Sequence, residues 1–453
     1  MLEIHELVKA TNGRLIKGNQ GVWIKGFSID SRTIEPAEVF IPIRGKNFDG
    51  HDFINEAIKK QASCIVSETL KQKVSTEKTA FIIVKDTTKA LGDIASYHRQ
   101  KFNIPVIAVT GSNGKTTAKE MVAWVLSGKS RVLKNKGTKN NQIGLPMTLL
   151  KLESNSDFAV LEAGSNHPGE IEHLSKICSA NIGAITNIGP SHLEFLKDLK
   201  GVCQEKTSLL KYLKDPAIAI LNADDTFLKV IAAKKKNKIA VFSFGINNKA
   251  DFLASQIKRF GGRIEFRVNK KNKFKLNTLG FFNIYNALIA IAAGRIFGLR
   301  YEDISSRLSD FVFLKNRLNL IELKNIRFIN DTYNSNPLSL KLALQVLRSF
   351  ESKGRKILIM GDMLELGQEE KKFHFQAGQS AAEVCDAFVT VGKLSKIAAE
   401  AAKRAGFDQR NIFSCENSQQ AREILFKSIA PGPDDVVLIK GSRSMKMEEV
   451  LNF

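Results

Sequence analysis

The sequence predicts an α/β protein of three domains, and three observations lead to this prediction. The chain has 453 residues, which is too long for a single hydrophobic core. A strand, a glycine-containing loop and a helix follow one another in residues 104–126. Apolar runs and helical stretches alternate again further along the chain. We therefore expect a small α/β domain in residues 1–100, a central parallel-sheet domain in residues 101–312 and a doubly wound domain in residues 313–453.

The composition excludes several classes of protein. Hydrophobic residues make up 43% of the chain and charged residues 25%, as in a globular protein. No apolar run approaches the ~20 residues that span a bilayer, and the start MLEIHELVKATNG lacks the basic and apolar parts of a signal peptide. The five cysteines form no C-x-x-C pair, so we expect neither a zinc site nor a disulfide framework. We expect a cytoplasmic monomer that does not insert into a membrane.

The net charge of +22 is compatible with nucleic acid, with an anionic substrate or with a simple bias toward lysine. The two basic clusters, residues 234–238 and 269–275, are dominated by lysine and lie between expected elements. They show no interleaved aromatic residues that would stack on bases. We interpret both clusters as solvated turns and expect no nucleic-acid partner.

Residues 1–100 alternate short apolar runs with one helical stretch. We expect strands at residues 40–43, 63–66 and 80–86 and a helix at residues 53–60. Polar residues follow two of the strand ends, where loops often bind ligands. The candidates there are Ser31, Arg32, Arg44 and Gly45, and on chemistry alone Ser31 and Arg32 fit a turn cap as well as an anion site.

The stretch IPVIAVTGSNGKTT, residues 104–117, has the order of a phosphate-binding loop. An apolar run ends in a loop with two glycines, and Lys-Thr-Thr then opens a helix. Glycines let backbone amides approach phosphate oxygens, and the helix N-terminus adds partial positive charge. The alternative is a tight strand–helix turn in an ordinary α/β domain. The residues expected to bind phosphate or magnesium here are Gly111, Ser112, Asn113, Gly114, Lys115, Thr116 and Thr117.

Three polar side chains follow later elements of the central domain. Glu162 ends the buried strand in DFAVLEAG, where a carboxylate next to a phosphate loop is well placed for a metal ion. His192 lies in the loop IGPSHLEFL after a further strand, and a histidine in a loop can also be merely structural or solvated. Lys206, by itself, reads as a surface lysine of a helix.

The remaining pattern completes both large domains. Residues 252–276 read as antiparallel strands with a Gly261-Gly262 turn, and an apolar helix opened by Asn283 follows. In the last domain we expect strands at residues 327–330, 356–360, 387–391 and 436–440, with a helix at residues 338–350.

Seven stretches together resemble the Mur ligase family, which comprises ATP-dependent amide ligases of peptidoglycan precursor synthesis. They are TGSNGKTT, LEAGSNHPGEI, ITNIGPSHLEFL, GFFNIYNALIAIA, NDTYNSNPLSLKLAL, MGDMLELG and LIKGSRSMKMEEV. The resemblance runs from Asp30 to the last turn and so extends over nearly the whole chain. The resemblance implies a UDP-substrate-binding first domain, a central P-loop ATPase domain and a C-terminal Rossmann-like domain. DTYNSNP, GDMLELG and KGSRSM resemble the branch that adds D-alanyl-D-alanine to UDP-N-acetylmuramoyl-tripeptide.

The resemblance also implies ATP, two Mg²⁺ ions and an acyl phosphate intermediate. The positions matching the family's metal ligands are Thr116, Glu162, His192 and Lys206, with Lys206 carried as a carbamate. The positions given catalytic roles are Lys115, Lys206, His192 and Asn187. Nucleotide contacts are implied for Asn283, Arg317, Asp331, Tyr333, Asn334 and Asn336. Substrate contacts are assigned to Ser31, Arg32, Arg44, Gly45, Asn140, Asn141 and Gln142.

Three rival readings remain. The nearest is the Mur ligase that adds the third amino acid to the UDP-dipeptide precursor. A more distant one is folylpolyglutamate synthase, against which the DSR…DGHDF pattern of the first domain argues. The third is a P-loop NTPase that binds nucleic acid, suggested by the net charge alone.

Overall fold

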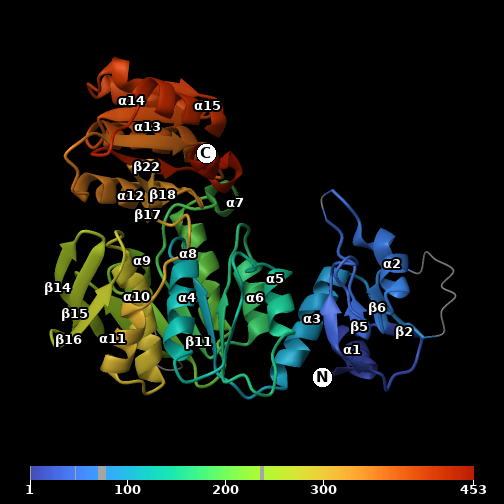
Figure 1. Ribbon diagram of the computed structural model, residues 1–453. Helices are drawn as coiled ribbons and strands as arrows, with labels where there is room; N and C mark the ends of the chain where they lie inside the picture. The colour runs from blue at the N-terminus through green and yellow to red at the C-terminus, as the bar shows by residue number, and fades with distance from the viewer. Residues whose placement is uncertain (1, 46, 70–77, 235–238, 453) are drawn as a thin grey trace.

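The computed structural model describes residues 2–45, 47–69, 78–234 and 239–452 and confirms the predicted α/β class. Three main sheets follow one another along the chain (Figure 1). The central part, from teal to yellow, carries the blue N-terminal part on one side and the orange-to-red C-terminal part on another. Residues 235–238 of the first lysine cluster lie outside the described residues.

The N-terminal part is built on a five-stranded sheet of order β2-β7-β6-β5-β4. The strands from β4 to β7 are parallel, and β2 is antiparallel to β7. The strand expected at residues 40–43 instead ends at Phe40. The elements are β1 (Leu2–Glu3), α1 (Ile4–Thr11), β2 (Arg14–Lys17), β3 (Trp23–Ile24), β4 (Gly26–Ser28), β5 (Glu38–Phe40), η1 (Gly50–Phe53), α2 (Ile54–Lys59), β6 (Cys64–Ser67), β7 (Ala80–Ile83) and α3 (Thr87–Gln100).

The central part is built on a nine-stranded sheet of order β16-β15-β14-β13-β12-β11-β8-β10-β9. Its elements are β8 (Val106–Thr110), α4 (Lys115–Leu126), β9 (Val132–Lys134), α5 (Gly144–Leu149), β10 (Phe158–Glu162), α6 (Glu170–Cys178), β11 (Ile182–Ile185), α7 (Leu193–Leu196), α8 (Leu199–Thr207), η2 (Ser208–Lys211), β12 (Ile218–Asn222), α9 (Thr226–Lys234), β13 (Ala240–Gly245), β14 (Phe252–Phe260), β15 (Arg263–Val268), β16 (Asn272–Leu276), α10 (Asn283–Ile296) and α11 (Tyr301–Ser309).

The register of this sheet places three polar loops at one edge. Strands β11, β8 and β10 are parallel neighbours, and Glu162 pairs with Val109 while Ile185 pairs with Thr110. Their carboxyl ends therefore lie together, which is where ligands bind in open parallel sheets. All five residues of β8 are buried, as expected for a strand with both faces covered.

The antiparallel region confirms one prediction and corrects another. Strands β14, β15 and β16 form the expected antiparallel meander, with Gly261 and Gly262 in the first turn. The cluster at residues 269–275 is not only a turn, because Asn272–Leu276 is a strand. Phe274 and Leu276 are buried there, whereas Lys273 is exposed and Lys275 half-buried, a period-2 alternation that the number of lysines obscured.

The C-terminal part is built on a six-stranded sheet of order β17-β18-β22-β19-β20-β21. All of its strands are parallel except β17, which pairs antiparallel with β18. Strands β17 and β21 were not expected. The elements are β17 (Asn319–Leu323), β18 (Ile326–Asp331), α12 (Pro337–Ser349), β19 (Lys356–Gly361), η3 (Gly367–Glu369), α13 (Glu370–Ala382), β20 (Ala387–Val391), α14 (Ser395–Arg404), η4 (Gln409–Asn411), β21 (Ile412–Cys415), α15 (Ser418–Glu423), η5 (Ile424–Ile429), β22 (Val436–Lys440), η6 (Arg443–Met445) and η7 (Met447–Leu451).

Both outer parts contact the central one. Helix α3 of the N-terminal part packs against α5 and α6, and Arg99 donates to the Cys178 carbonyl. The C-terminal part contacts the central one where η3 meets α7, and there Gly367 approaches the backbone of Glu194. Each helix within the described ranges is too short or too polar to cross a membrane.

Candidate active site

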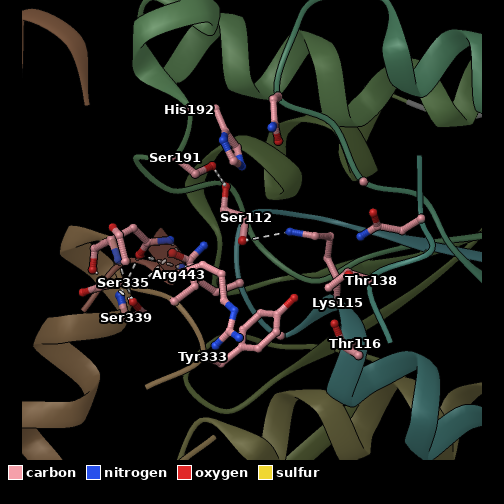
Figure 2. A pocket seen from close by; sticks show the side chains of 18 of the residues that line it. Ser112, Lys115, Thr116, Thr138, Ser191, His192, Tyr333, Ser335, Ser339 and Arg443 are labelled. Carbon is pink, nitrogen blue, oxygen red and sulfur yellow. Dashed lines mark hydrogen bonds between the residues drawn. The ribbon is translucent and has the colours of Figure 1, made fainter. Parts of the chain in front are cut away.

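A cavity of about 770 Å³ lies between the central and C-terminal parts (Figure 2). This volume lies within the range of small-molecule sites. Most residues singled out in the sequence line it, although they are spread over more than 200 positions of the chain. They are Ser112, Asn113, Gly114, Lys115, Thr116, Thr117, Asn140, Asn141, Gln142, Glu162, His192, Asn283, Arg317, Asp331, Tyr333, Asn334 and Asn336.

The loop between β8 and α4 needs both of its glycines. Gly111 has φ +138° and a Cβ there would lie 2.1 Å from Thr186 Oγ1. Gly114 has φ +81° and a Cβ would lie 2.4 Å from Asn286 Oδ1. No side chain of the described residues caps the N-terminus of α4, so its first amides can donate hydrogen bonds to a phosphate.

Lys115 begins α4 and bends back over the loop. Its ammonium donates to the carbonyls of Gly111 at 2.8 Å and Ser112 at 3.1 Å (Figure 2). Burial lowers the pKa of Lys115, Glu162 opposes this effect and Arg317 adds to it. The ammonium is thus held where phosphate oxygens would replace the carbonyls as its partners.

Asn187 supports the loop rather than lining the cavity. Its side chain accepts from the Asn113 amide at 3.1 Å and donates to the Asn113 carbonyl at 3.0 Å. Its own carbonyl accepts from the Ser112 amide at 2.9 Å. Gly111 is likewise absent from the cavity wall formed by the described residues. Both act on the ligand site through the conformation of the loop.

Glu162 presents a carboxylate oxygen that has no partner. Its Oε1 accepts from Asn140 Nδ2 at 2.7 Å, and its Oε2 is buried without a hydrogen bond within the described residues. Asn135, which is fully buried, clamps the backbone of Glu162 by accepting from its amide and donating to its carbonyl. A buried, unpaired and rigidly held carboxylate oxygen fits a Mg²⁺ ligand.

Lys206 is fully buried, which corrects its reading as a surface lysine. Its ammonium donates to Ser165 Oγ at 2.7 Å and to the Ser165 carbonyl at 3.2 Å. Burial and the charge of Lys115 lower the pKa of Lys206 to about 7, against the opposing effect of Glu205 and Glu170. Ser165 lines the cavity and Lys206 lies behind it.

His192 connects the two walls of the cavity. It has φ +53°, and its Nδ1 lies 2.5 Å from Glu365 Oε2 of the C-terminal part. This contact lowers the pKa of Glu365. The opposite ring nitrogen, Nε2, forms no hydrogen bond with the described residues and keeps its capacity to bind a ligand. No three His, Cys, Asp or Glu side chains of the described residues gather into a metal site, so a metal here would also need hydroxyl, lysine-derived or phosphate oxygens.

Two residues of the C-terminal part reach the phosphate loop. Arg317 Nη2 donates to Thr116 Oγ1 at 3.1 Å while its guanidinium stacks on Tyr333, 3.8 Å from the ring centre. Asn336 exchanges two side-chain hydrogen bonds with Asn113, of 2.8 and 3.3 Å. Asn336 also caps α12, so its orientation is fixed by the start of that helix.

The cavity wall on the C-terminal side contains an ion pair that the sequence did not predict. Lys440 Nζ lies 2.6 Å from Asp331 Oδ2, and both residues end neighbouring parallel strands. Burial raises the pKa of Asp331, against the opposing effect of Lys440. Asn283, also buried, donates to Thr278 Oγ1 at 3.0 Å at the start of α10.

The candidate residues of the N-terminal part do not line this cavity. Arg32 pairs with Asp30, and Arg44 pairs with Asp49 and Glu68. Ser31 Oγ donates to Glu56 at 2.8 Å, and Gly45 bonds to Phe48 within the same loop. The cations proposed for an anionic ligand are therefore balanced by carboxylates of the same region.

Several lining residues were not singled out in the sequence: Thr138, Ser165, Glu170, Ser335, Glu365 and Ser444. Lys440 and Arg443 also line the cavity, as expected for polar residues that follow the apolar run VVLIK at the carboxyl end of a parallel strand. Glu365 lies in the matching stretch MGDMLELG, but nothing in the sequence predicted its contact with His192, which is 173 residues away.

The fold and the cavity define a three-domain α/β protein in which a loop of the phosphate-binding type lines a cavity between two of the domains. Three family models match the chain: Mur ligase family, catalytic domain, at residues 23–99; Mur ligase middle domain at residues 109–294; and Mur ligase, glutamate ligase domain, at residues 316–443. The chain belongs to the Mur ligase family and is an ATP-dependent ligase that forms C–N bonds.

Individual relatives are similar over nearly their whole lengths. The UDP-N-acetylmuramoyl-tripeptide–D-alanyl-D-alanine ligase of Bacillus subtilis is 34% identical, over 94% of this chain and 92% of the relative. A crystal structure of MurF from Acinetobacter baumannii has 31% identity and a TM-score of 0.90, covering 99% of this chain and 97% of that one. MurF from Thermotoga maritima, solved in complex with ADP, has 28% identity and a TM-score of 0.83, covering 94% and 96%.

Proposed function

We propose that this Mur ligase joins D-alanyl-D-alanine to UDP-N-acetylmuramoyl-tripeptide at the expense of ATP and so forms the pentapeptide precursor of peptidoglycan. The names of the similar proteins support the choice of substrates. The observation that carries the reaction class is the cavity itself. It brings Lys115 of the phosphate loop together with Arg317 and Asn336 of the C-terminal part.

The reaction consists of two displacements. A carboxylate oxygen of the tripeptide attacks the γ-phosphorus of ATP, the bond to the β,γ-bridging oxygen breaks, and ADP leaves. The amine of D-alanyl-D-alanine then attacks the acyl carbon, loses a proton, and phosphate leaves with the shared oxygen. A carboxylate needs this activation because oxide is too poor a leaving group, whereas phosphate leaves readily.

The residues of the cavity provide positive charge where two anions must meet. Lys115 and the free amides of α4 bind the β- and γ-phosphates, and Arg317 reaches the same phosphates from the C-terminal side. Asp331 and Asn336 hold the nucleoside side, with Asn283 and Tyr333 at its edge. Closure of the cavity around these groups excludes water from the acyl phosphate.

We propose that two Mg²⁺ ions bind at this site. Their ligands would be Glu162 Oε2, Thr116 Oγ1, His192 Nε2 and a carbamate on Lys206, and the unpaired Oε2 of Glu162 is the strongest support for a metal ion. When bound, Mg²⁺ neutralises the phosphate charge that would repel the attacking carboxylate. Asn140 and Asn135 keep Glu162 in its orientation.

Carbamylation of Lys206 is chemically accessible. At a pKa of about 7, about half of the side chains are neutral amines at pH 7. The amine lone pair attacks the carbon of CO₂, an N–C bond forms, and the ammonium proton is lost to solvent. The product replaces a buried cation by an anion beside Ser165, whose hydroxyl can then donate to it.

The domain boundaries, the N-terminal ligand site and the solution state belong to the same proposal. We assign residues 1–100 to binding of the UDP moiety through Ser31, Arg32, Arg44 and Gly45, residues 101–312 to ATP and residues 313–453 to ligation. Asn140, Asn141 and Gln142 face the acyl donor. Because its substrates are nucleotides and a free dipeptide, we assign the enzyme to the cytoplasm. We also propose that it is a monomer, and light scattering on the purified chain checks its mass.

A phosphate-release assay tests the function. ATP, UDP-N-acetylmuramoyl-tripeptide and D-alanyl-D-alanine together are expected to release phosphate, while omission of any one abolishes release. The UDP-dipeptide precursor with free amino acids is the matched comparison for the preceding step of the pathway, and DNA or RNA is the comparison for a nucleic-acid-dependent NTPase. Faster release with either comparison than with the proposed pair contradicts the assignment.

A further inference from the structure

Two residues with left-handed backbone meet across the boundary between the central and C-terminal parts. His192 lies between β11 and α7 with φ +53°, and Glu365 lies between β19 and η3 with φ +61°. Both residues line the cavity. A left-handed conformation is uncommon for a residue that carries a side chain, and it persists only where the surrounding contacts hold it. The contacts of these two loops therefore point to a role for the pair.

The two loops fit closely against each other. His192 Nδ1 lies 2.5 Å from Glu365 Oε2, and the Glu365 carbonyl accepts from the Glu194 amide at 3.2 Å. Two residues further on, Gly367 has φ +59°, and a Cβ there would lie 3.1 Å from the Glu194 Cα. The side-chain contact of His192 with Glu365 thus forms only when the C-terminal part is docked on the central part.

The loop that carries His192 is fastened at both ends. Ser191 Oγ donates to Ser112 Oγ of the phosphate loop at 3.1 Å (Figure 2), and Asp225 accepts from the Ile188 amide at 2.6 Å. The backbone on either side of His192 is therefore held by the central part itself. What remains to be set is the orientation of the imidazole ring and the nitrogen that carries its proton.

Glu365 sets both. A carboxylate offers only acceptors, so a neutral His192 must donate from Nδ1, and its lone pair then lies on Nε2. Histidines that bind metal ions commonly donate their other ring N–H to a carboxylate in this way. Among the described residues, Glu365 forms no ion pair with a lysine or arginine, so its carboxylate is not shared with a stronger cation.

A purely structural role accounts poorly for this pair. The side chain of Glu365 is 42% exposed and that of His192 is 20% exposed. Ion pairs with this much exposure contribute little to stability. The backbone contact of Glu365 with Glu194 and the close approach of Gly367 would join the two parts without any carboxylate.

We propose that Glu365 is a positioning residue whose carboxylate accepts the Nδ1–H of His192 and so presents Nε2 to Mg²⁺. The inference rests on the metal site of the proposed function. It adds a residue of the C-terminal domain to a site whose proposed ligands all belong to the central domain. The histidine ligand is then oriented only in the docked arrangement, which couples metal binding to closure of the cavity.

Metal affinity is the first readout. Enzyme with β,γ-methylene-ATP and UDP-N-acetylmuramoyl-tripeptide is titrated with Mn²⁺, and electron paramagnetic resonance measures the free ion. His192→Gln identifies the Mn²⁺ site to which the histidine contributes. Glu365→Ala is expected to weaken that same site by about 10- to 100-fold, the effect of losing an outer partner of a metal ligand. Glu365→Gln keeps an oxygen that can accept from Nδ1 and should recover most of the affinity.

The position of the ring proton is the second readout, which a merely structural contact would not change. Long-range ¹H–¹⁵N spectra of metal-free enzyme labelled with ¹⁵N-histidine are recorded at alkaline pH, where imidazoles are neutral. The chain has 7 histidines, and the His192 signals are those missing from His192→Gln. Wild type is expected to carry the proton on Nδ1, and Glu365→Ala to shift it toward Nε2.

The matched control is Glu369→Ala, a glutamate of the same segment that is similarly exposed and pairs with Lys372. It should keep both the Mn²⁺ affinity and the tautomer of wild type. Wild-type Mn²⁺ affinity in Glu365→Ala, or an unchanged tautomer in that variant, overturns the inference. Neither measurement uses the acyl acceptor, so wild type that fails to release phosphate with D-alanyl-D-alanine overturns the proposed function instead.

Discussion

The two regions proposed to bind ligands differ in how their cationic side chains are paired before a ligand binds. At the junction of the central and C-terminal domains, Arg317 already touches Thr116, and Asn336 already bonds to Asn113. In the N-terminal domain, Arg32 and Arg44 are instead paired with carboxylates of their own domain. No residue from 2–100 within the described ranges lines the shared cavity.

This difference indicates two ways of binding an anion. In the proposed nucleotide site, the cations already point into the cavity, so their interactions with phosphate would be preorganised. In the proposed UDP site, the arginines would first have to exchange their carboxylate partners for phosphate. Such an exchange costs little, because exposed ion pairs contribute only about 0–1 kcal/mol each.

The largest effect is expected from Lys115. Lys115→Ala removes a cation from the transferring phosphate and should raise the activation free energy by about 4 kcal/mol, close to a thousandfold in turnover at saturating ATP. Lys129→Ala, an exposed lysine of the same domain, is the matched control and should leave turnover unchanged. Near-normal turnover of Lys115→Ala would remove the phosphate loop from the mechanism.

The next effect tests the carbamate. Lys206→Ala should lose at least about 100-fold in activity, because a metal ligand and its charge are both gone. Added formate or acetate should restore part of the activity by entering the vacated space as a carboxylate. Lys115→Ala should show no such rescue under the same salts. Full activity of Lys206→Ala without any additive would exclude the carbamate.

A pair of variants sharpens the comparison between the two regions. Asn336→Ala should raise the KM for ATP by about 3- to 10-fold, the value of a hydrogen bond or two, and leave the KM for the UDP-tripeptide unchanged. Arg44→Ala should raise the KM for the UDP-tripeptide and leave the KM for ATP unchanged. Steady-state kinetics with each substrate varied in turn checks both. If both variants change the same KM, the two regions do not bind different ligands.

Local sequence patterns predicted the loop and the carboxylate that line the cavity better than the residues that hold them in place. The apolar run 104–109, its two glycines and Glu162 at the end of a buried strand each carry a local signal. Asn135 looks like an ordinary loop asparagine, yet it is fully buried and holds Glu162 by its backbone. Lys440 and Asp331 are 109 residues apart, and only the strand order β18-β22 brings them together.

The same limit applies to parts of the fold. Strand β17 alternates half-buried with exposed residues, and in β21 only the last residue is buried, so neither shows the continuous apolar run of the inner strands. Lys206 reads as a surface residue from its neighbours because burial depends on how α8 packs against other helices. Residues placed by contacts distant in sequence are the ones that local patterns miss.

The smallest expected effect is a loss of folding stability at acid pH, and it should be similar in the C-terminal and N-terminal domains. Burial lowers the pKa of His374 in the C-terminal domain and of His98 in the N-terminal domain. His374 Nε2 accepts from the Met363 amide at 3.0 Å, which only a neutral ring can do. The unfolded chain, with histidine near pKa 6.5, binds more protons, so stability present above that pH is lost as pH falls below it.

Thermal melts between pH 5 and pH 8 measure this effect. For each kcal/mol of unfolding free energy lost below pH 6.5, the Tm of wild type should fall by about 2–4 °C. His374→Gln cannot be protonated at this position, so its Tm should fall less steeply with decreasing pH. His98→Gln should do the same, independently. A variant slope equal to that of wild type would remove the histidine from the acid response.

The most direct test of the mechanism follows one oxygen atom. UDP-N-acetylmuramoyl-tripeptide with an ¹⁸O-labelled terminal carboxylate is incubated with ATP, D-alanyl-D-alanine and enzyme, and the released phosphate is analysed by mass spectrometry. Attack of the carboxylate on the γ-phosphorus predicts that each phosphate released carries one carboxylate oxygen. Amide product accompanied by phosphate without label would contradict the account.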